Sequence, residues 1–156
     1  MGTSILDGKT ILAVDDEPDV LTVLEEEIIV ACPTCKFDTA TTFQAAVKKL
    51  QSKTYDLVIL DIMGVRGFDL LDLAVSRNMK VVMLTAHAFN PEALKRSFDM
   101  KARSYLPKTK LGEVIPFLED ALTQEFLPGW ELLFKKLESS FRKWKVRWID
   151  MDFSDD

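Results

Sequence analysis

The sequence has little histidine or cysteine and no long apolar run. It contains one histidine and two cysteines among 156 residues, whereas a structural zinc site normally takes four ligands. No stretch approaches the roughly 20 apolar residues that a membrane span needs. The first residues, Met1 to Asp7, lack the basic start and apolar stretch of a signal peptide. We therefore expect a cytoplasmic location and no contact with a membrane.

Positive charge is also in the minority. Lysine and arginine number 20 against 25 acidic residues, which gives a net charge of -5. Because nucleic-acid binders normally carry a basic face, direct contact with nucleic acid is not expected. Hydrophobic residues make up 47% of the chain, enough for a substantial core. The length predicts one domain, placed at 1–127, and an extension at 128–156.

Apolar runs alternate with amphipathic segments along the chain. This alternation is typical of βα repeats around a parallel sheet, so we predict an α/β fold. Pro18 and Pro91 suit the first turns of two of the helices, where a missing N–H costs nothing. The expected strands are 10–14, 36–40, 56–60, 80–84 and 103–106, and the expected helices lie near 18–30, 42–52, 67–77, 91–99 and 110–125.

Carboxylates follow two of the apolar runs. Asp15 and Asp16 follow the first run, and Asp61 follows the third. The carboxyl ends of parallel strands share one edge of a sheet, where Thr85 and Lys108 should also lie. Carboxylates held so near to one another repel, so the cluster needs a bound cation or shifted pKa values. Mg²⁺ is a suitable cation because it prefers oxygen ligands. Ordinary capping of helices is the alternative role for these aspartates.

This set of side chains is suited to phosphoryl transfer. A carboxylate beside a metal ion can attack phosphorus and form an acyl phosphate. A lysine ammonium and a hydroxyl can stabilise the charge on the transferring group. The sequence therefore predicts a magnesium-dependent phosphoryl-acceptor site.

The chain resembles the receiver domain of bacterial two-component response regulators over about residues 9–125. The resemblance implies a flavodoxin-like, doubly wound sheet with strand order 2-1-3-4-5. The motifs that carry it are Val14-Asp15-Asp16-Glu17-Pro18, Leu57-Val58-Ile59-Leu60-Asp61-Ile62-Met63, Leu84-Thr85-Ala86 and Ala102-Arg103-Ser104-Tyr105-Leu106-Pro107-Lys108.

The resemblance assigns a role to each residue around the metal. Asp61 would accept a phosphoryl group from a sensor histidine kinase or a phosphotransfer protein. Asp16 and Asp61 would ligate Mg²⁺ directly, Asp15 would act through water, and Met63 would offer its backbone carbonyl. Lys108 would bridge to the phosphate.

Two further residues would form the switch. Thr85 would move toward the new phosphate, and Tyr105 would rotate inward behind it, a bistable change driven by local charge. The surface around 86–110 would then meet an unknown downstream protein. A homodimer through this surface or through the C-terminal helix is one alternative for the assembly.

The sequence departs from the family at two points. The loop from Asp61 to Gly67 is shorter than usual and lacks the customary proline. Thr109 follows Lys108 where the family has proline after a cis peptide bond. A non-proline cis bond costs about 2.5–4 kcal/mol, so the bond at this position is either trans or held under strain.

Two smaller features leave alternatives open. His87, two residues past Thr85, is either a gatekeeper for water or an exposed loop residue. Cys32-Pro33-Thr34-Cys35 has the spacing of a redox pair or half a zinc site. A redox pair usually precedes a helix, whereas this one precedes a predicted strand, so we favour a simple structural turn.

The C-terminal extension combines an apolar stripe with basic residues. Pro128-Gly129 is expected to break the chain before a new helix, and residues 150–156 are expected to fray. We favour packing of the stripe on its own domain or on a second copy over binding to a membrane or another partner. The stripe is Trp130, Leu133, Leu137, Phe141, Trp144 and Trp148; the basic residues are Lys135, Lys136, Arg142, Lys143, Lys145 and Arg147.

These observations predict a signalling switch rather than a metabolic enzyme, with self-catalysed phosphoryl uptake and loss at Asp61. The main alternative is a degenerate receiver that acts as a phosphorylation-independent adaptor through its C-terminal helix. A metal-dependent phosphohydrolase ranks last, because Met63 stands where such an enzyme has a second aspartate.

Overall fold

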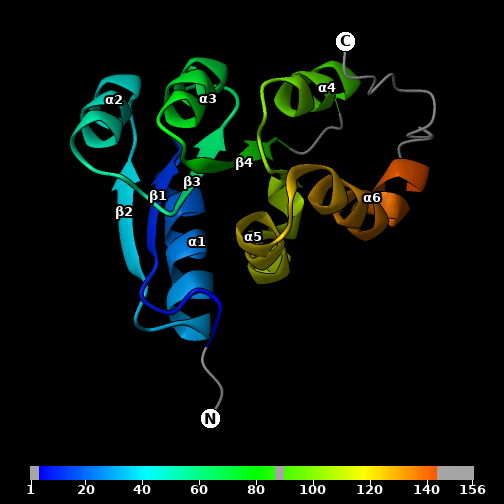
Figure 1. The fold of residues 1–156 in the computed structure, drawn as a ribbon, viewed down its shortest axis with the longest axis horizontal. Coiled ribbons are helices and arrows are strands. Elements are labelled where there is room, and N and C mark those ends of the chain that lie inside the picture. The colour runs from blue at the N-terminus through cyan, green and yellow to red at the C-terminus, as the bar shows by residue number, and fades with distance from the viewer. Residues whose placement is uncertain (1–3, 87–89, 144–156) are drawn as a thin grey trace.

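The computed structural model describes residues 4–86 and 90–143. Its centre is a parallel sheet with strand order β2-β1-β3-β4-β5 (Figure 1). This confirms the predicted topology. The strands are β1 (Thr10–Val14), β2 (Lys36–Ala40), β3 (Leu57–Asp61), β4 (Lys80–Thr85) and β5 (Ser104–Pro107).

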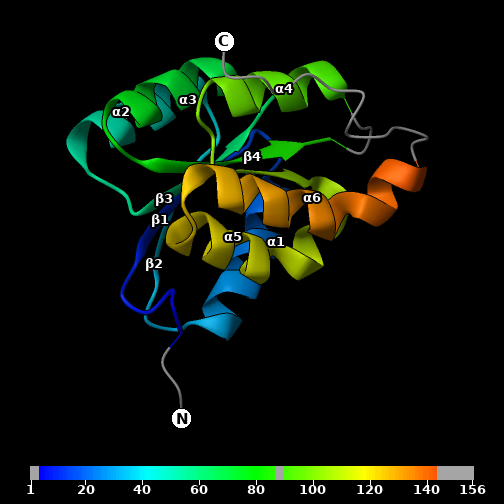
Figure 2. The same ribbon diagram turned by 45° about the vertical axis from the view of Figure 1, so that its right-hand side comes forward.

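Helices cover both faces of the sheet. Figure 2 shows α2, α3 and α4 on one face, with α1 and α5 on the other and α6 beside α5. The helices are α1 (Pro18–Ala31), α2 (Phe43–Ser52), α3 (Gly67–Ser76), α4 (Pro91–Asp99), α5 (Val114–Thr123) and α6 (Phe126–Lys143), and a 3₁₀ helix, η1 (Lys108–Glu113), precedes α5.

The central strands are buried on both faces, which explains their uninterrupted apolar runs. Every residue of β3 is buried, as are all but the first residues of β1 and β4. β3 extends one residue further than predicted and includes Asp61. The Asp61 carboxylate is therefore anchored at the end of a rigid strand.

Two helix starts follow the predicted local chemistry. Pro18 and Pro91 each begin a helix, and the Asn90 side chain accepts hydrogen bonds from the N–H groups of Glu92 and Ala93. The single helix predicted over 110–125 is wrong. Lys110 has non-helical backbone angles, and the segment divides into η1 and α5.

The prediction of a break at Pro128-Gly129 is also wrong, because α6 already begins at Phe126. Pro128 lies in the first turn, where an N–H has no partner within the helix. Trp130, Leu133 and Leu137 are buried, which confirms the apolar stripe over this part. Trp144, Trp148 and the acidic residues 150–156 lie outside the described residues.

None of the described helices is long and apolar enough to cross a membrane.

Candidate functional site

Three carboxylates gather at the carboxyl ends of β1 and β3. These strands are neighbours in the sheet, with Val14 opposite Leu60, so the residues that follow them meet. Asp15, Asp16 and Asp61 each offer an oxygen, and these oxygens lie within 4.8 Å of one another. Asp15 is fully buried and Asp61 is 4% exposed, whereas Asp16 is open to solvent. The structure thus brings the three predicted aspartates into one cluster.

The cluster is electrostatically strained. Burial, reinforced by the nearby charge of Asp15, raises the pKa of Asp61 to about 6. Burial also raises the pKa of Asp15. Both shifts mean that the folded protein disfavours the charged forms of Asp15 and Asp61. A cation bound between these carboxylates would offset that cost.

Lys108 supplies part of the missing positive charge. Its Nζ lies 3.0 Å from Asp15 Oδ2 and 3.2 Å from Asp61 Oδ1. Burial alone would lower the pKa of Lys108, but Asp15 and Asp61 raise it overall. The ammonium is therefore charged and aimed at the cluster.

From the sequence alone, the peptide bond after Lys108 could be cis or trans. No cis peptide bond occurs in the described parts of the chain, so Lys108-Thr109 is trans. Lys108 directly follows β5 and is the first residue of η1. Its side chain still reaches Asp61. The absent proline has not turned the lysine away from the site.

Glu17 is a site residue that sequence reasoning missed. Its Oε2 lies 3.3 Å from Lys108 Nζ, so it shares the ammonium with Asp15 and Asp61. The available signal was its place directly after the two aspartates at the start of α1. Asp15 Oδ1 also accepts a hydrogen bond of 2.9 Å from the Glu17 N–H, an Asx turn that precedes α1, whose N-cap residue is Glu17.

The short loop after Asp61 packs against the Asp16 carboxylate. Gly64 has φ +84, and a Cβ built on it would lie 2.5 Å from Asp16 Oδ2. The loop therefore depends on a glycine at this point. Met63 is 72% exposed, and the use of its backbone carbonyl as a metal ligand stays a prediction.

We expect Gly64→Ala to weaken Mg²⁺ binding at least tenfold, because the methyl group would displace Asp16. Isothermal titration calorimetry with Mg²⁺ measures this directly. Gly8→Ala is the matched control, since Gly8 has φ +71 but no atom within 4 Å of its Cβ position. It should have similar backbone strain with unchanged Mg²⁺ affinity. Equal affinities in the two variants would contradict the expectation.

Thr85 and Tyr105 occupy neighbouring strands beside the carboxylates. Thr85 ends β4 and is 6% exposed, and Tyr105 in β5 is fully buried. Tyr105 is thus already in the inward position. Burial raises the pKa of Tyr105, while the neighbouring Thr85 side chain and Asn90 backbone act in the opposite direction. His87 lies outside the described residues.

The Cys32–Cys35 segment behaves as a structural turn. Both cysteines are free and buried. Cys32 Sγ donates to Asp7 Oδ1 at 3.0 Å, and Cys35 Sγ donates to the Leu6 carbonyl at 3.2 Å. Burial raises the pKa of Cys35 to about 11, which keeps its thiol protonated and unreactive.

Comparison with known proteins agrees with this geometry. The family model for the response regulator receiver domain matches residues 11–116. The two-component response regulator ARR18 of Arabidopsis thaliana is 34% identical over 94 residues, which cover 56% of this chain. The match spans only 14% of the length of ARR18.

Solved structures share the fold. A response regulator from Chloroflexus aurantiacus superposes with a TM-score of 0.66 at 23% identity, covering 76% of this chain and 100% of its own. The phosphorylated cyanobacterial phytochrome response regulator RcpA gives a TM-score of 0.64 at 20% identity, with 77% of this chain and 98% of its own covered. With the family model spanning most of the sheet and its helices, the chain belongs to the response regulator receiver domain family.

Proposed function

We propose that the protein is a phosphorylation-dependent signalling switch whose phosphoryl acceptor is Asp61. The observation that carries this proposal is the buried Asp61 carboxylate, held 3.2 Å from Lys108 Nζ beside two further aspartates. With a pKa of about 6, the carboxylate is largely ionised at neutral pH and can act as a nucleophile.

The transfer uses Asp61 and Lys108 of the site and a phosphohistidine of the donor. A carboxylate oxygen of Asp61 attacks the phosphorus of a phosphohistidine on a kinase or phosphotransfer protein. The P–N bond breaks as the new P–O bond forms, and the donor histidine leaves. Lys108 stabilises the charge on the phosphoryl oxygens.

The three carboxylates fit a divalent cation, since their oxygens lie within 4.8 Å of one another and the pKa values of Asp15 and Asp61 are raised. Asp16 and Asp61 would bind Mg²⁺ directly, with Asp15 acting through water and Met63 through its carbonyl. The ion would neutralise the transferring phosphoryl group.

The readout would pass through Thr85 and Tyr105 to a protein partner. The Tyr105 hydroxyl lies beside the Thr85 side chain, so a movement of Thr85 would change the surroundings of that hydroxyl. Part of the surface at 86–110 is covered by α6, because Trp130 contacts Phe98 and Ala102. The partner surface therefore includes α6 itself.

Acetyl phosphate with Mg²⁺ provides the test. Intact-mass spectrometry should show one added phosphoryl group on the unchanged chain and none on Asp61→Asn. Asp99→Asn is the matched control, because Asp99 is an exposed aspartate on α4 that pairs with Lys95. It should take up the group as the unchanged chain does.

A second candidate function is a phosphorylation-independent adaptor, favoured by the close packing of α6 on the domain. No adduct at any Mg²⁺ concentration would overturn the switch and leave the adaptor. An adduct on both aspartate variants would instead place the acceptor elsewhere.

A further inference from the structure

Arg66 has an unusual backbone conformation in the loop that joins β3 to α3. Its φ is +56, in the left-handed region that residues with a Cβ rarely adopt. Gly64, two residues earlier, also has a positive φ, but glycine adopts it freely. A side chain held in such a conformation needs contacts that compensate for the strain. Arg66 makes two contacts of this kind.

The Arg66 guanidinium joins the loop to two helices. Its Cζ lies 4.1 Å from the centre of the ring of Phe43, the first residue of α2. This is a cation–π contact, in which the positive charge lies over the negative face of the ring. Arg66 Nε also donates to Asp69 Oδ2 of α3 at 2.9 Å. Together these three side chains form the Arg66 anchor.

The anchored loop lies directly against the carboxylate cluster. A Cβ on Gly64 would be 2.5 Å from Asp16 Oδ2, so the loop backbone has no space to approach Asp16 more closely. The far end of the loop is equally confined, because a Cβ on Gly67 would be 2.2 Å from the Asp61 carbonyl oxygen. The Gly67 N–H donates to the Ile62 carbonyl at 3.2 Å. The only movement open to the loop is outward, away from Asp16.

We propose that the Arg66 anchor prevents this outward movement and so positions the loop for metal binding. Arg66 is a positioning residue, because it acts through the loop backbone and does not touch the ion. This role rests on the proposed function, in which Asp16 and the Met63 carbonyl are ligands of Mg²⁺. Without the anchor, the loop is correctly placed in only a fraction of molecules, and the apparent Mg²⁺ affinity falls by that fraction.

Exposure of the anchor to water sets the size of its effect. The side chains of Arg66 and Asp69 are 64% and 58% exposed, so their ion pair contributes little. The contact with Phe43 is the larger component, since that ring packs against the hydrophobic core. Loss of an exposed cation–π contact should weaken Mg²⁺ binding about twofold to fivefold.

Isothermal titration calorimetry with Mg²⁺ on a double-mutant cycle tests the proposal. Arg66→Asn removes the guanidinium but keeps a residue that tolerates positive φ, and Phe43→Leu keeps apolar bulk without the ring. Each should weaken Mg²⁺ binding about twofold to fivefold. The double variant should bind no more weakly than either single variant. Phe43→Tyr retains the aromatic face and should bind Mg²⁺ as the unchanged chain does.

Arg77→Gln is the matched control. Arg77 also links α3 to α2, because its Nη2 donates to the Gln51 carbonyl at 3.3 Å. It follows the last residue of α3, and Gln51 lies in the last turn of α2, so this link is at the other end of both helices. Its loss should leave the Mg²⁺ affinity unchanged.

Hydrogen exchange in the metal-free chain provides a second measurement that does not depend on the ion. The Gly67 amide should exchange about twofold to fivefold faster in Phe43→Leu than in the unchanged chain. This variant leaves the sequence neighbours of the amide as they are, so the change reports the loop and not the intrinsic exchange rate.

Two results with a chain that binds Mg²⁺ would overturn the positioning role and leave the proposed function intact. One is equal Mg²⁺ affinity in the anchor variants and the unchanged chain. The other is a loss in the double variant equal to the product of the single losses, which would show that Arg66 and Phe43 act separately. An unchanged chain that binds no Mg²⁺ would instead contradict the proposed metal site. The Gly67 amide then decides: faster exchange in Phe43→Leu supports the anchor, and unaltered exchange overturns it.

Discussion

Replacing Asp61 with asparagine is expected to make the metal-free protein more stable by up to about 3 kcal/mol at pH 7.5. The folded state raises the pKa of Asp61 from 3.8 to about 6. The difference, 6 minus 3.8, is about 2, and each pKa unit corresponds to about 1.4 kcal/mol. The ionised carboxylate thus destabilises the folded protein, and the neutral amide removes this cost.

The pH dependence has a definite sign. Because the folded pKa is the higher one, the folded state binds more protons between about pH 4 and pH 6. The cost is fully present above pH 6 and disappears as the pH falls toward 4. The stabilisation in Asp61→Asn should therefore be large at pH 7.5 and small at pH 4.

Urea denaturation at the two pH values measures this effect. Asp99→Asn, on the exposed face of α4, should leave the free energy of unfolding nearly unchanged at both. Mg²⁺ at 1,000 times its Kd should reverse the order, because it adds about 4.1 kcal/mol to the chain that binds it. A loss of stability in metal-free Asp61→Asn at pH 7.5 would contradict the proposed strain.

Trp130→Ala should have the largest destabilising effect, a loss of about 3–5 kcal/mol in the free energy of unfolding. Truncating a large buried side chain removes its transfer free energy and leaves a cavity. Trp130 is 1% exposed and contacts aromatic rings of α4 and α6. The substitution also leaves the Ala102 carbonyl without its donor.

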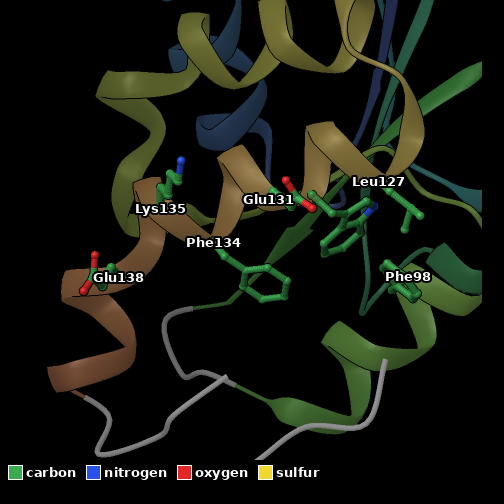
Figure 3. A pocket seen from close by; sticks show the side chains of 7 residues that line it. Phe98, Leu127, Glu131, Phe134, Lys135 and Glu138 are labelled. Carbon is green, nitrogen blue, oxygen red and sulfur yellow. The ribbon is translucent and has the colours of Figure 1, made fainter. Parts of the chain in front are cut away.

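Two companion variants separate these contributions. Trp130→Phe keeps one aromatic ring and loses the pyrrole part of the indole with its N–H, so its loss of stability should be smaller than that of Trp130→Ala. Leu127→Ala, on the same helix (Figure 3) but 55% exposed, should cost less than about 1 kcal/mol. All three are compared by urea denaturation. A Trp130→Ala variant as stable as Leu127→Ala would show that α6 is not part of the cooperative core.

The sheet and its carboxylates were predictable because their signals are local. Each buried strand is an apolar run, and Asp15 and Asp61 follow such runs directly. Parallel pairing then brings the strand ends together without further information. This explains why the positions of the three aspartates and Lys108 follow from the sequence.

The features that the sequence did not predict depend on side-chain geometry. Glu17 reaches Lys108 across 91 residues of sequence, and no local pattern reports this ion pair. The short loop gives no sign that Gly64 packs against Asp16. Pro128 was expected to break the chain because proline does so within helices, but it fits the first turn of α6.

The position of α6 has a consequence for how the sheet ends. β5 is a terminal strand of the sheet, and one side of such a strand has unpaired N–H and C=O groups to which another extended chain can add. α6 contacts β5 at the end of the sheet opposite β2 (Figure 1). The helix thus lies against the last strand of the sheet. A receiver shortened before Phe126 would lose this neighbour of β5, so its sheet would end in a more exposed strand.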